Sequence, residues 1–168
     1  MKKLILGIGV TLTLVLTSCG PSQDDAIKYN DQLIATQKML LPAQDGFIAQ
    51  IDGHNVYSLK LAHELFKSRA KTALEECEKM TPFNGKREYL DAGIAYFQVL
   101  KSLADNEAKE ITEIMSKDST QITEKDIERV KACATKFDAD YGKALKTAQE
   151  AQAVFSKEWN FDIKPEEK

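Results

Sequence analysis

The chain has 168 residues, of which 23 are basic and 26 acidic, so its formal net charge is -3. This length suits one domain, and the composition is typical of a globular protein. The lysines alternate with glutamates at helical spacings and form no basic stripe, which argues against a nucleic-acid partner. Only six glycines and four prolines follow residue 18, too few for a many-stranded sheet. We therefore expect an all-α protein.

The first 18 residues have the pattern of a secretory signal peptide. Met1-Lys2-Lys3 is positively charged, and an apolar run of 13 residues follows from Leu4 to Leu16. This run is shorter than the roughly 20 residues that a membrane-spanning helix needs. Without Lys2 and Lys3 the chain keeps 21 basic and 26 acidic residues, a net charge of -5. We expect residues 1–18 to be removed on secretion.

The end of this segment, Leu16-Thr17-Ser18-Cys19, resembles the lipobox of bacterial lipoproteins. The resemblance implies cleavage between Ser18 and Cys19, with the Cys19 thiol carrying a diacylglycerol. Several acyl chains, each contributing about 0.8 kcal/mol per buried methylene, anchor a domain stably without a membrane span. The expected product is a domain held at the membrane by its N-terminal lipid, with residues 19–23 as the tether.

The residues after Cys19 bear on the location of the protein. Gly20 is not the aspartate that favours retention in the inner membrane of enterobacteria, so we expect attachment to the outer membrane. The pair Asp24-Asp25 resembles the surface-export signal of lipoproteins in Bacteroidota, which implies exposure on the outer face. A second interpretation is local, because Ser22 and Asp25 also form a helix capping box. Both interpretations stay open.

Four segments with apolar residues three and four apart predict helices. They are Asp24 to Ile51, Val56 to Met80, Lys86 to Lys117, and Thr123 to about Trp159. The connections are short, which forces neighbouring helices to run antiparallel. We predict an up-down-up-down four-helix bundle over residues 24–163, followed by a disordered tail over residues 164–168.

Pro42 lies inside the first predicted helix. An interior proline removes one backbone hydrogen bond and clashes with the preceding turn. We expect a kinked helix there, and the alternative is two helices broken between Leu41 and Gly46.

The last segment has the clearest helical pattern. Thr123 and Asp126 form another capping box, and Ile122 is placed to staple onto Ile127. Apolar residues then follow in alternating steps of three and four: Ile127, Val130, Ala134, Phe137, Tyr141, Ala144, Ala148, Ala151 and Phe155. This period predicts a helix that packs in a bundle.

Three amides, Asn30, Gln37 and Gln44, fall in the middle of the apolar arc of the first helix. On the third predicted helix, Glu107 falls on the apolar seam. The amides either bond across to other helices and fix their register or line an internal pocket for a small ligand, with Glu107 on its far side. A buried Glu107 should be paired, solvated or protonated.

The other reactive residues do not assemble into a recognisable site. His54 and His63 are the only histidines, and neither completes a Glu-x-x-His pair of the kind that binds iron in bundles. Asp138-Ala139-Asp140-Tyr141-Gly142 lacks the remaining ligands of a calcium loop. Cys77 and Cys133 are predicted to be too far apart along the bundle for a disulfide, hence two unpaired, largely buried thiols. We expect no metal and no cofactor.

Two further motifs follow the lipobox: Tyr29-Asn30-Asp31-Gln32-Leu33 with Gln37, and the C-terminal Phe155-Ser156-Lys157-Glu158-Trp159-Asn160-Phe161. Together with the lipobox, they resemble an uncharacterised family of helical surface lipoproteins from Leptospira and Bacteroidota. The resemblance implies an envelope location and a helical bundle, and it brings no catalytic residues.

The alternation in Trp159 to Ile163 predicts an extended tail that covers the bundle end. The alternative is an exposed aromatic hook for a partner.

These observations predict a lipid-anchored envelope protein that interacts with another protein or serves a structural role. The alternative is a carrier of a small ligand in an interior lined by Asn30, Gln37, Gln44 and Glu107. A third hypothesis is an enzyme whose site is assembled from scattered residues, although we expect no catalysis. An elongated internal cavity would favour the carrier, whereas a packed core with an exposed apolar patch would favour the interaction protein.

Overall fold

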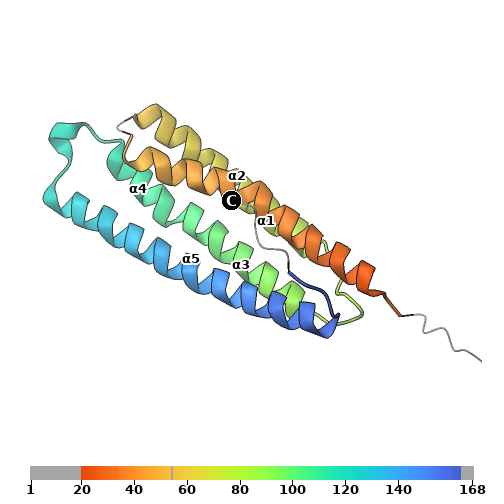
Figure 1. The fold of residues 1–168 in the computed structure, drawn as a ribbon. Helices are drawn as coiled ribbons and strands as arrows, with labels where there is room; N and C mark the ends of the chain where they lie inside the picture. Colours follow the sequence, from red (N-terminus) through yellow and green to blue (C-terminus); the bar gives the residue numbers. More distant parts are fainter. Residues whose placement is uncertain (1–19, 54, 164–168) are drawn as a thin grey trace, which may run out of the picture.

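The computed structural model describes residues 20–53 and 55–163, and its regular structure is helical (Figure 1). The elements are α1 (Gln23–Ile51), α2 (Val56–Glu78), α3 (Glu88–Asp105), α4 (Glu107–Met115), the 3-10 helix η1 (Ser119–Gln121) and α5 (Glu124–Glu158). No strand occurs within those ranges, where one isolated bridge pairs Phe83 with Lys86. The predicted all-α class is confirmed. The predicted signal peptide, Ser18, Cys19, His54 and the tail over 164–168 lie outside the described residues.

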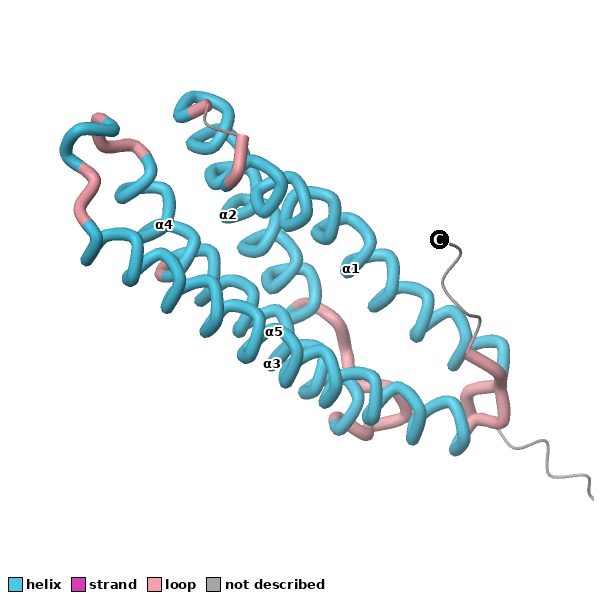
Figure 2. The backbone as a smooth tube through the Cα atoms, turned by 60° about the vertical axis from the view of Figure 1, so that its left-hand side comes forward, coloured by secondary structure: helices cyan, strands magenta, loops and turns pink. Residues whose placement is uncertain are grey.

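The helices pack side by side as four long rods, with α3 and α4 in series forming one rod (Figures 1 and 2). α1 packs on α2, α2 on α3, and both α3 and α4 on α5, while α1 meets α5 more loosely. The apolar stripes that the sequence places along each helix are thereby covered by neighbouring helices. Within residues 20–53 and 55–163, no helix has the combination of length and apolar character needed to cross a bilayer.

Both predicted capping boxes are present. The Ser22 hydroxyl accepts from the Asp25 amide at 3.2 Å, and the Asp25 carboxylate accepts from the Ser22 amide at 2.9 Å. Thr123 and Asp126 make the same reciprocal pair at 3.1 Å in each direction. Each box satisfies amides of the first turn that have no partner inside the helix, which fixes where α1 and α5 begin.

α1 continues as one helix through Pro42, so the alternative of two helices broken between Leu41 and Gly46 is wrong. Pro42 has no amide hydrogen to donate, and its ring lies on the exposed side of the helix. The buried residues on both sides of it, among them Leu40 and Ala43, keep α1 packed on the core.

The sequence predicts one helix from Lys86 to Lys117, and the structure corrects this prediction. Helix α3 begins at Glu88 and ends at Asp105, and α4 starts at Glu107. At the break, the Asn106 side-chain amide donates to the Ser102 carbonyl at 2.9 Å and to the Ser102 hydroxyl at 3.2 Å. A short amide side chain that bonds to its own backbone competes with helical pairing, so the helix is interrupted without leaving the rod.

The connection between α2 and α3 contains a tight turn at Asn84 and Gly85. Both residues have positive φ, 50° and 76°, and the Lys86 amide donates to the Phe83 carbonyl at 2.9 Å. Asn and Gly are the residues that tolerate this conformation most readily. The turn brings Phe83 and Lys86 beside each other at the end of the bundle.

Aromatic side chains cross the middle of the core. Phe66 on α2 is fully buried, with its ring centroid 6.1 Å from Phe47 on α1 and 6.0 Å from Phe137 on α5. His63 is buried as well, and its Nε2 donates to the Ala104 carbonyl at 2.8 Å. This bond holds the His63 ring in the core beside the α3–α4 break.

The apolar seam of α5 faces the bundle over most of its length, with Phe137 and Phe155 buried along it. Ile127, predicted to belong to this seam, is 47% exposed. In this first turn Asp126 takes the inward position instead, where its carboxylate accepts from Lys117 at 2.7 Å. The capping box and this ion pair together set the orientation of the turn.

Asp126 gives the fold a defined acid sensitivity. The bond from Lys117, followed by the bonds from Thr123, lowers the pKa of the Asp126 carboxyl from 3.8 to about 2. A carboxyl with a lowered pKa in the folded state stabilises the fold above its unfolded pKa, and the contribution disappears as the pH falls through the folded pKa. We predict that Asp126→Asn lowers the free energy of unfolding at neutral pH and that the difference from wild type closes between pH 3.8 and about 2.

Denaturant titrations across this pH range measure the effect. Asp138→Asn, at an exposed aspartate on the same helix, is the matched control and should change little at any pH. A difference for Asp126→Asn that persists undiminished at pH 2 would contradict this account.

Candidate functional site

The predicted interior amides begin with Asn30, which connects three helices. Its Oδ1 accepts from the Tyr89 hydroxyl on α3 at 2.9 Å and from the Gln152 amide on α5 at 2.9 Å. Asn30 is buried, so its acceptor would cost free energy if these partners were absent. The bonds agree with the structural interpretation of this amide, in which it fixes the register between helices.

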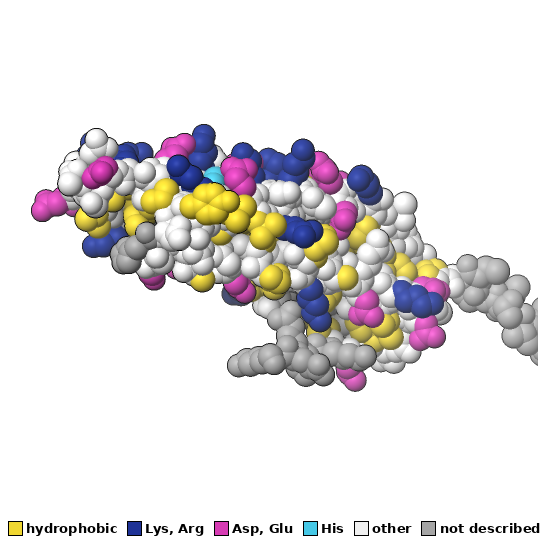
Figure 3. Space-filling model, turned by 90° about the horizontal axis from the view of Figure 1, so that it is seen from above, with side chains coloured by type: hydrophobic (Ala, Val, Ile, Leu, Met, Phe, Trp, Pro, Cys, Tyr) yellow, Lys and Arg dark blue, Asp and Glu magenta, His cyan; other side chains and the backbone are white. Residues whose placement is uncertain are grey.

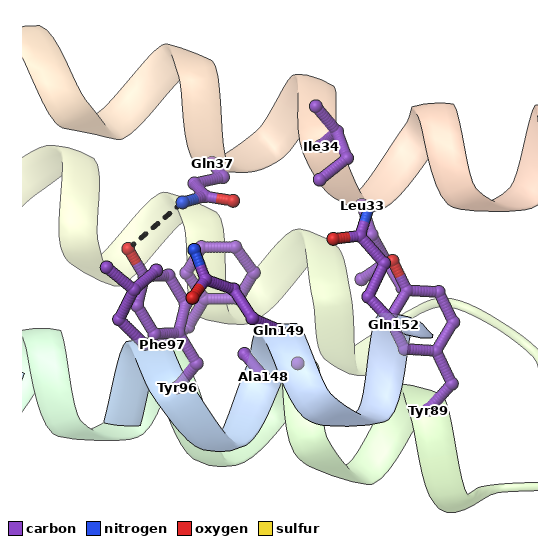
Figure 4. Close-up of a pocket in the computed structure, with 11 residues that line it drawn as sticks. Leu33, Ile34, Gln37, Tyr89, Tyr96, Phe97, Ala148, Gln149 and Gln152 are labelled. Atoms are coloured by element: carbon purple, nitrogen blue, oxygen red, sulfur yellow. Dashed lines mark hydrogen bonds between the residues drawn. The ribbon is translucent and has the colours of Figure 1, made fainter. Parts of the chain in front are cut away.

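Gln37 lies farther along α1 and lines a small cavity between α1, α3 and α5 (Figure 4). Its amide donates to the Tyr96 hydroxyl at 3.5 Å, which is long for a hydrogen bond. The cavity measures about 40 Å³ and is also lined by Gln149 and Gln152. At about 10–15 Å³ for each water, it has room for a few waters and none for a metabolite.

Gln44 and Glu107 do not line this cavity. Gln44 is buried at 3% exposure, and its Oε1 has no hydrogen-bond partner within the described residues. Of the four predicted residues, only Gln37 therefore lines the cavity. One continuous polar lane does not connect them.

Glu107 is buried at the start of α4 and pairs with Lys136 on α5, with 2.6 Å between Oε1 and Nζ. The bond to Glu107, with a second to Asp140, raises the pKa of the Lys136 ammonium to about 12. The expectation that a buried Glu107 would be paired is confirmed. The partner was not predicted, because 29 residues separate the two and only the packing of α4 on α5 brings them together.

The remaining reactive side chains are dispersed. Cys77 and Cys133 are both free, as predicted, but only Cys77 is buried, and burial raises the pKa of its thiol to about 11. Cys133 is only partly buried, so that part of the prediction is wrong. In the described part of the chain, no three His, Cys, Asp or Glu side chains are arranged to hold a metal ion.

The outer surface carries a feature that the sequence reasoning missed. Tyr57, Leu61 and Leu65 on α2 are 78%, 60% and 48% exposed. Their spacing of four residues puts them on one face, opposite the buried Leu59, His63 and Phe66 of the same helix. The signal was present in the sequence, since two apolar stripes on one helix cannot both face the same core.

Five of the eight exposed large hydrophobic side chains in the described chain belong to the hairpin of α1 and α2: the three of the stripe, Ile48 on α1, and Val56 at the start of α2. Figure 3 shows hydrophobic side chains gathered on the face that carries these two helices, bordered by charged residues. Such a concentration is a usual mark of a binding surface, whereas scattered single residues are not.

Two charged residues border the stripe on the side of α4. Lys60 and Glu64 are one helical turn apart, and both contribute to a shallow groove between α2 and α4. Unlike many lysines and glutamates along the described chain, neither has an ion-pair partner within 4 Å. The face therefore combines an apolar centre with one unpaired charge of each sign.

Comparisons with known protein families, with characterised proteins and with solved structures found no match to this chain.

Substitution of Asn30 and Gln37 tests how much each amide contributes to the stability of the fold. We predict that Asn30→Leu lowers the free energy of unfolding by about 2 kcal/mol, because it leaves the Tyr89 hydroxyl and the Gln152 amide without their shared acceptor. Gln37→Leu should cost less than about 0.5 kcal/mol, since only one long bond is lost and Leu33 and Phe97 line the same cavity. Equal losses for both variants, measured by denaturant titration, would contradict the distinction.

Proposed function

We propose that the chain is a lipid-anchored protein of the bacterial envelope that acts by protein association, with α2 as the contact surface and a second copy of the chain as its partner. The observation that carries the proposal is the exposed stripe of Tyr57, Leu61 and Leu65. It is outside the bundle and has no structural task within the described fold.

The stripe suits pairing across a two-fold axis. Leu61 lies at its centre, with Tyr57 and Leu65 one turn away on either side. If two α2 helices pack antiparallel about Leu61, each Tyr57 meets the Leu65 of the other copy, so both copies use the same surface. Tyrosine is favoured at the centre of interfaces because it buries a large area with few rotatable bonds.

The charges beside the stripe support the same arrangement. In an antiparallel pair centred on Leu61, residue 60 is opposite residue 62 of the other copy, so Lys60 lies diagonally across from Glu64 of that copy, and the symmetry makes this contact twice. Within the described residues neither side chain has an ion-pair partner at 4 Å or less, so no existing pair has to break. Complementary charges at the edge of an interface fix its register more than they add affinity.

The lipid anchor explains why a small interface is sufficient. Cys19 lies outside the described residues, and α1 begins at Gln23, so only a few residues separate the proposed anchor from the bundle. Anchored chains share a thin layer at the membrane, which raises their effective concentration and favours weak association. The resemblance to surface lipoproteins and the lack of an aspartate at Gly20 support the outer membrane as the location, with Asp24-Asp25 supporting exposure on its outer face.

The chain path assumed here is up-down-up-down, with α1 kinked near Pro42. Its support is the short connections between rods, of which Asp52 to Asn55 is the shortest, and the placement of the α1–α2 and α4–α5 connections at one end in Figure 1. The missing amide hydrogen at Pro42 supports the kink. This path leaves the face of α2 that carries Tyr57, Leu61 and Leu65 on the outside of the bundle.

The alternative, a carrier of a small ligand among the interior amides, has less support. Its interior space measures about 40 Å³ and includes only Gln37 of the four residues concerned. Drug-sized ligands occupy pockets of about 300–1,000 Å³. The packed core and the exposed patch instead favour association at the surface.

The anchor is tested by Cys19→Ser. We predict that this variant carries no diacylglycerol and keeps residues 1–18, because no thiol is present at position 19 to be acylated before cleavage. Cys133→Ser, which changes the partly buried thiol on α5, is the control and should carry the lipid. Intact-mass measurement of both proteins reads the lipid directly, and an unchanged mass for Cys19→Ser would disprove the anchor.

The contact surface is tested by Leu61→Glu. In an antiparallel pair this change places two carboxylates against each other at the two-fold axis, so we predict a dimer weakened by at least about tenfold in sedimentation equilibrium. Val154→Glu, at an exposed apolar residue of α5, is the matched control and should dimerise as wild type does.

Charge exchange separates this geometry from non-specific adhesion. Lys60→Glu alone should weaken the dimer, and Lys60→Glu with Glu64→Lys should restore it, because the reciprocal pair is remade. A wild-type chain that stays monomeric at all concentrations, or a dimer that is indifferent to Leu61→Glu, would overturn the proposal.

A further inference from the structure

Aromatic side chains from three helices and a turn meet at the end of the bundle where α1 begins. Phe83 occupies the centre, with ring centroids 5.2 Å from Tyr29, 5.5 Å from Phe155 and 4.9 Å from Trp159. Tyr89 stacks on Phe155 at 4.7 Å. The C-terminal residues pack over this group, because the Phe161 ring contacts Phe155 and the Phe161 amide donates to Ser156. Phe161 of the predicted tail thus packs on the bundle end and is no free hook, but Trp159 and Asn160 form a hydrogen-bonded turn where the sequence predicts an extended segment.

This packing leaves a cleft of about 330 Å³ beside the rings. It is lined by five aromatic side chains, Tyr29, Phe83, Tyr89, Phe155 and Trp159. A volume near 300 Å³ with mainly apolar walls and a few polar groups is characteristic of small-ligand sites. The cleft is about eight times larger than the cavity beside Gln37.

The charges at the cleft are unequal. Lys86 and Glu158 both line it and bond to each other, so they neutralise one another. Glu88, at the first turn of α3, also lines the cleft and makes no ion pair within 4 Å in the described chain. Burial raises the pKa of the Tyr29 hydroxyl to about 12 and keeps that of Tyr89 above its ordinary value, so both rings stay neutral. The cleft therefore carries one uncompensated negative charge beside five aromatic rings.

We infer that the cleft binds an organic cation, a quaternary ammonium group, with Glu88 supplying the countercharge. Aromatic rings attract cations through their negative faces, and this attraction suits a quaternary ammonium because its methyl groups also bury apolar surface. A simple metal ion is disfavoured because aromatic side chains make up half of the lining and Glu88 supplies its one carboxylate outside an ion pair. The inference does not depend on association through α2, which uses a different part of the surface.

Binding in the cleft can be measured by tryptophan fluorescence. Trp159 is the only tryptophan of the chain, and its ring lines the cleft, so its fluorescence responds to occupancy. We predict that choline changes this fluorescence in a saturable way. The neutral isostere dimethylbutanol, in which carbon replaces the charged nitrogen, should bind more weakly. Equal binding of the two compounds, or no binding of choline, would overturn the inference.

Variants locate the site. Glu88→Gln keeps the side-chain shape and removes the charge, so choline should bind about threefold more weakly while dimethylbutanol is unaffected. Glu128→Gln, at an exposed glutamate near the other end of α5, is the control and should bind choline as wild type does. Phe83→Leu should weaken both compounds, with circular dichroism to verify that the fold is kept. Wild-type affinity in both Glu88→Gln and Phe83→Leu would refute the assignment.

A quaternary ammonium group can come from a free solute or from a lipid headgroup, and the two sources are separable. A chain that begins at Gly20, and so lacks both the signal peptide and the lipid, is mixed with vesicles of phosphatidylcholine or of phosphatidylglycerol and sedimented. Binding to the phosphatidylcholine vesicles that Glu88→Gln weakens identifies the headgroup as the ligand. Choline binding in solution without such vesicle binding identifies a free solute, and the absence of both contradicts the inference.

Discussion

The packing of aromatic rings from α1 and α5 against Phe66 of α2 is the constraint on which the rest of the structure depends. Phe66 contacts aromatic rings of α1 and α5, and small residues such as Ala70 and Ala73 continue its buried face along α2. Protein interiors of this kind are filled to the density of organic crystals, so the core leaves only a small gap beside Gln37. The proposed recognition accordingly uses the outer surface and the end of the bundle.

Two such places differ in chemistry and position. The α2 face offers an apolar centre between unpaired charges of both signs, which suits a flat protein partner. The end cleft is concave, aromatic and negative, which suits a small cation. The turn at Asn84 and Gly85 matters for the second, because it holds Phe83 and Lys86 at the rim.

The sequence predicts the parts of this fold that local chemistry controls. The capping boxes at Ser22 and Thr123 and the breakers before α2 and α3 were predictable because each acts within a few residues. The break at Asn106 was not, since asparagine inside a periodic segment carries no unique signal. The pairing of Glu107 with Lys136 and the gathering of five rings around Phe83 depend on tertiary packing, which spacing along one helix does not reveal.

Native mass spectrometry of the protein released gently from its host membrane tests most directly whether partners and ligands bind at the surface and ends of the bundle or in its interior. The account predicts the mass of the lipidated chain and of its dimer, and any small ligand retained should be lost with Phe83→Leu and kept with Gln37→Leu. A stoichiometric ligand that is lost with Gln37→Leu and kept with Phe83→Leu would place the binding site inside the bundle and contradict the account.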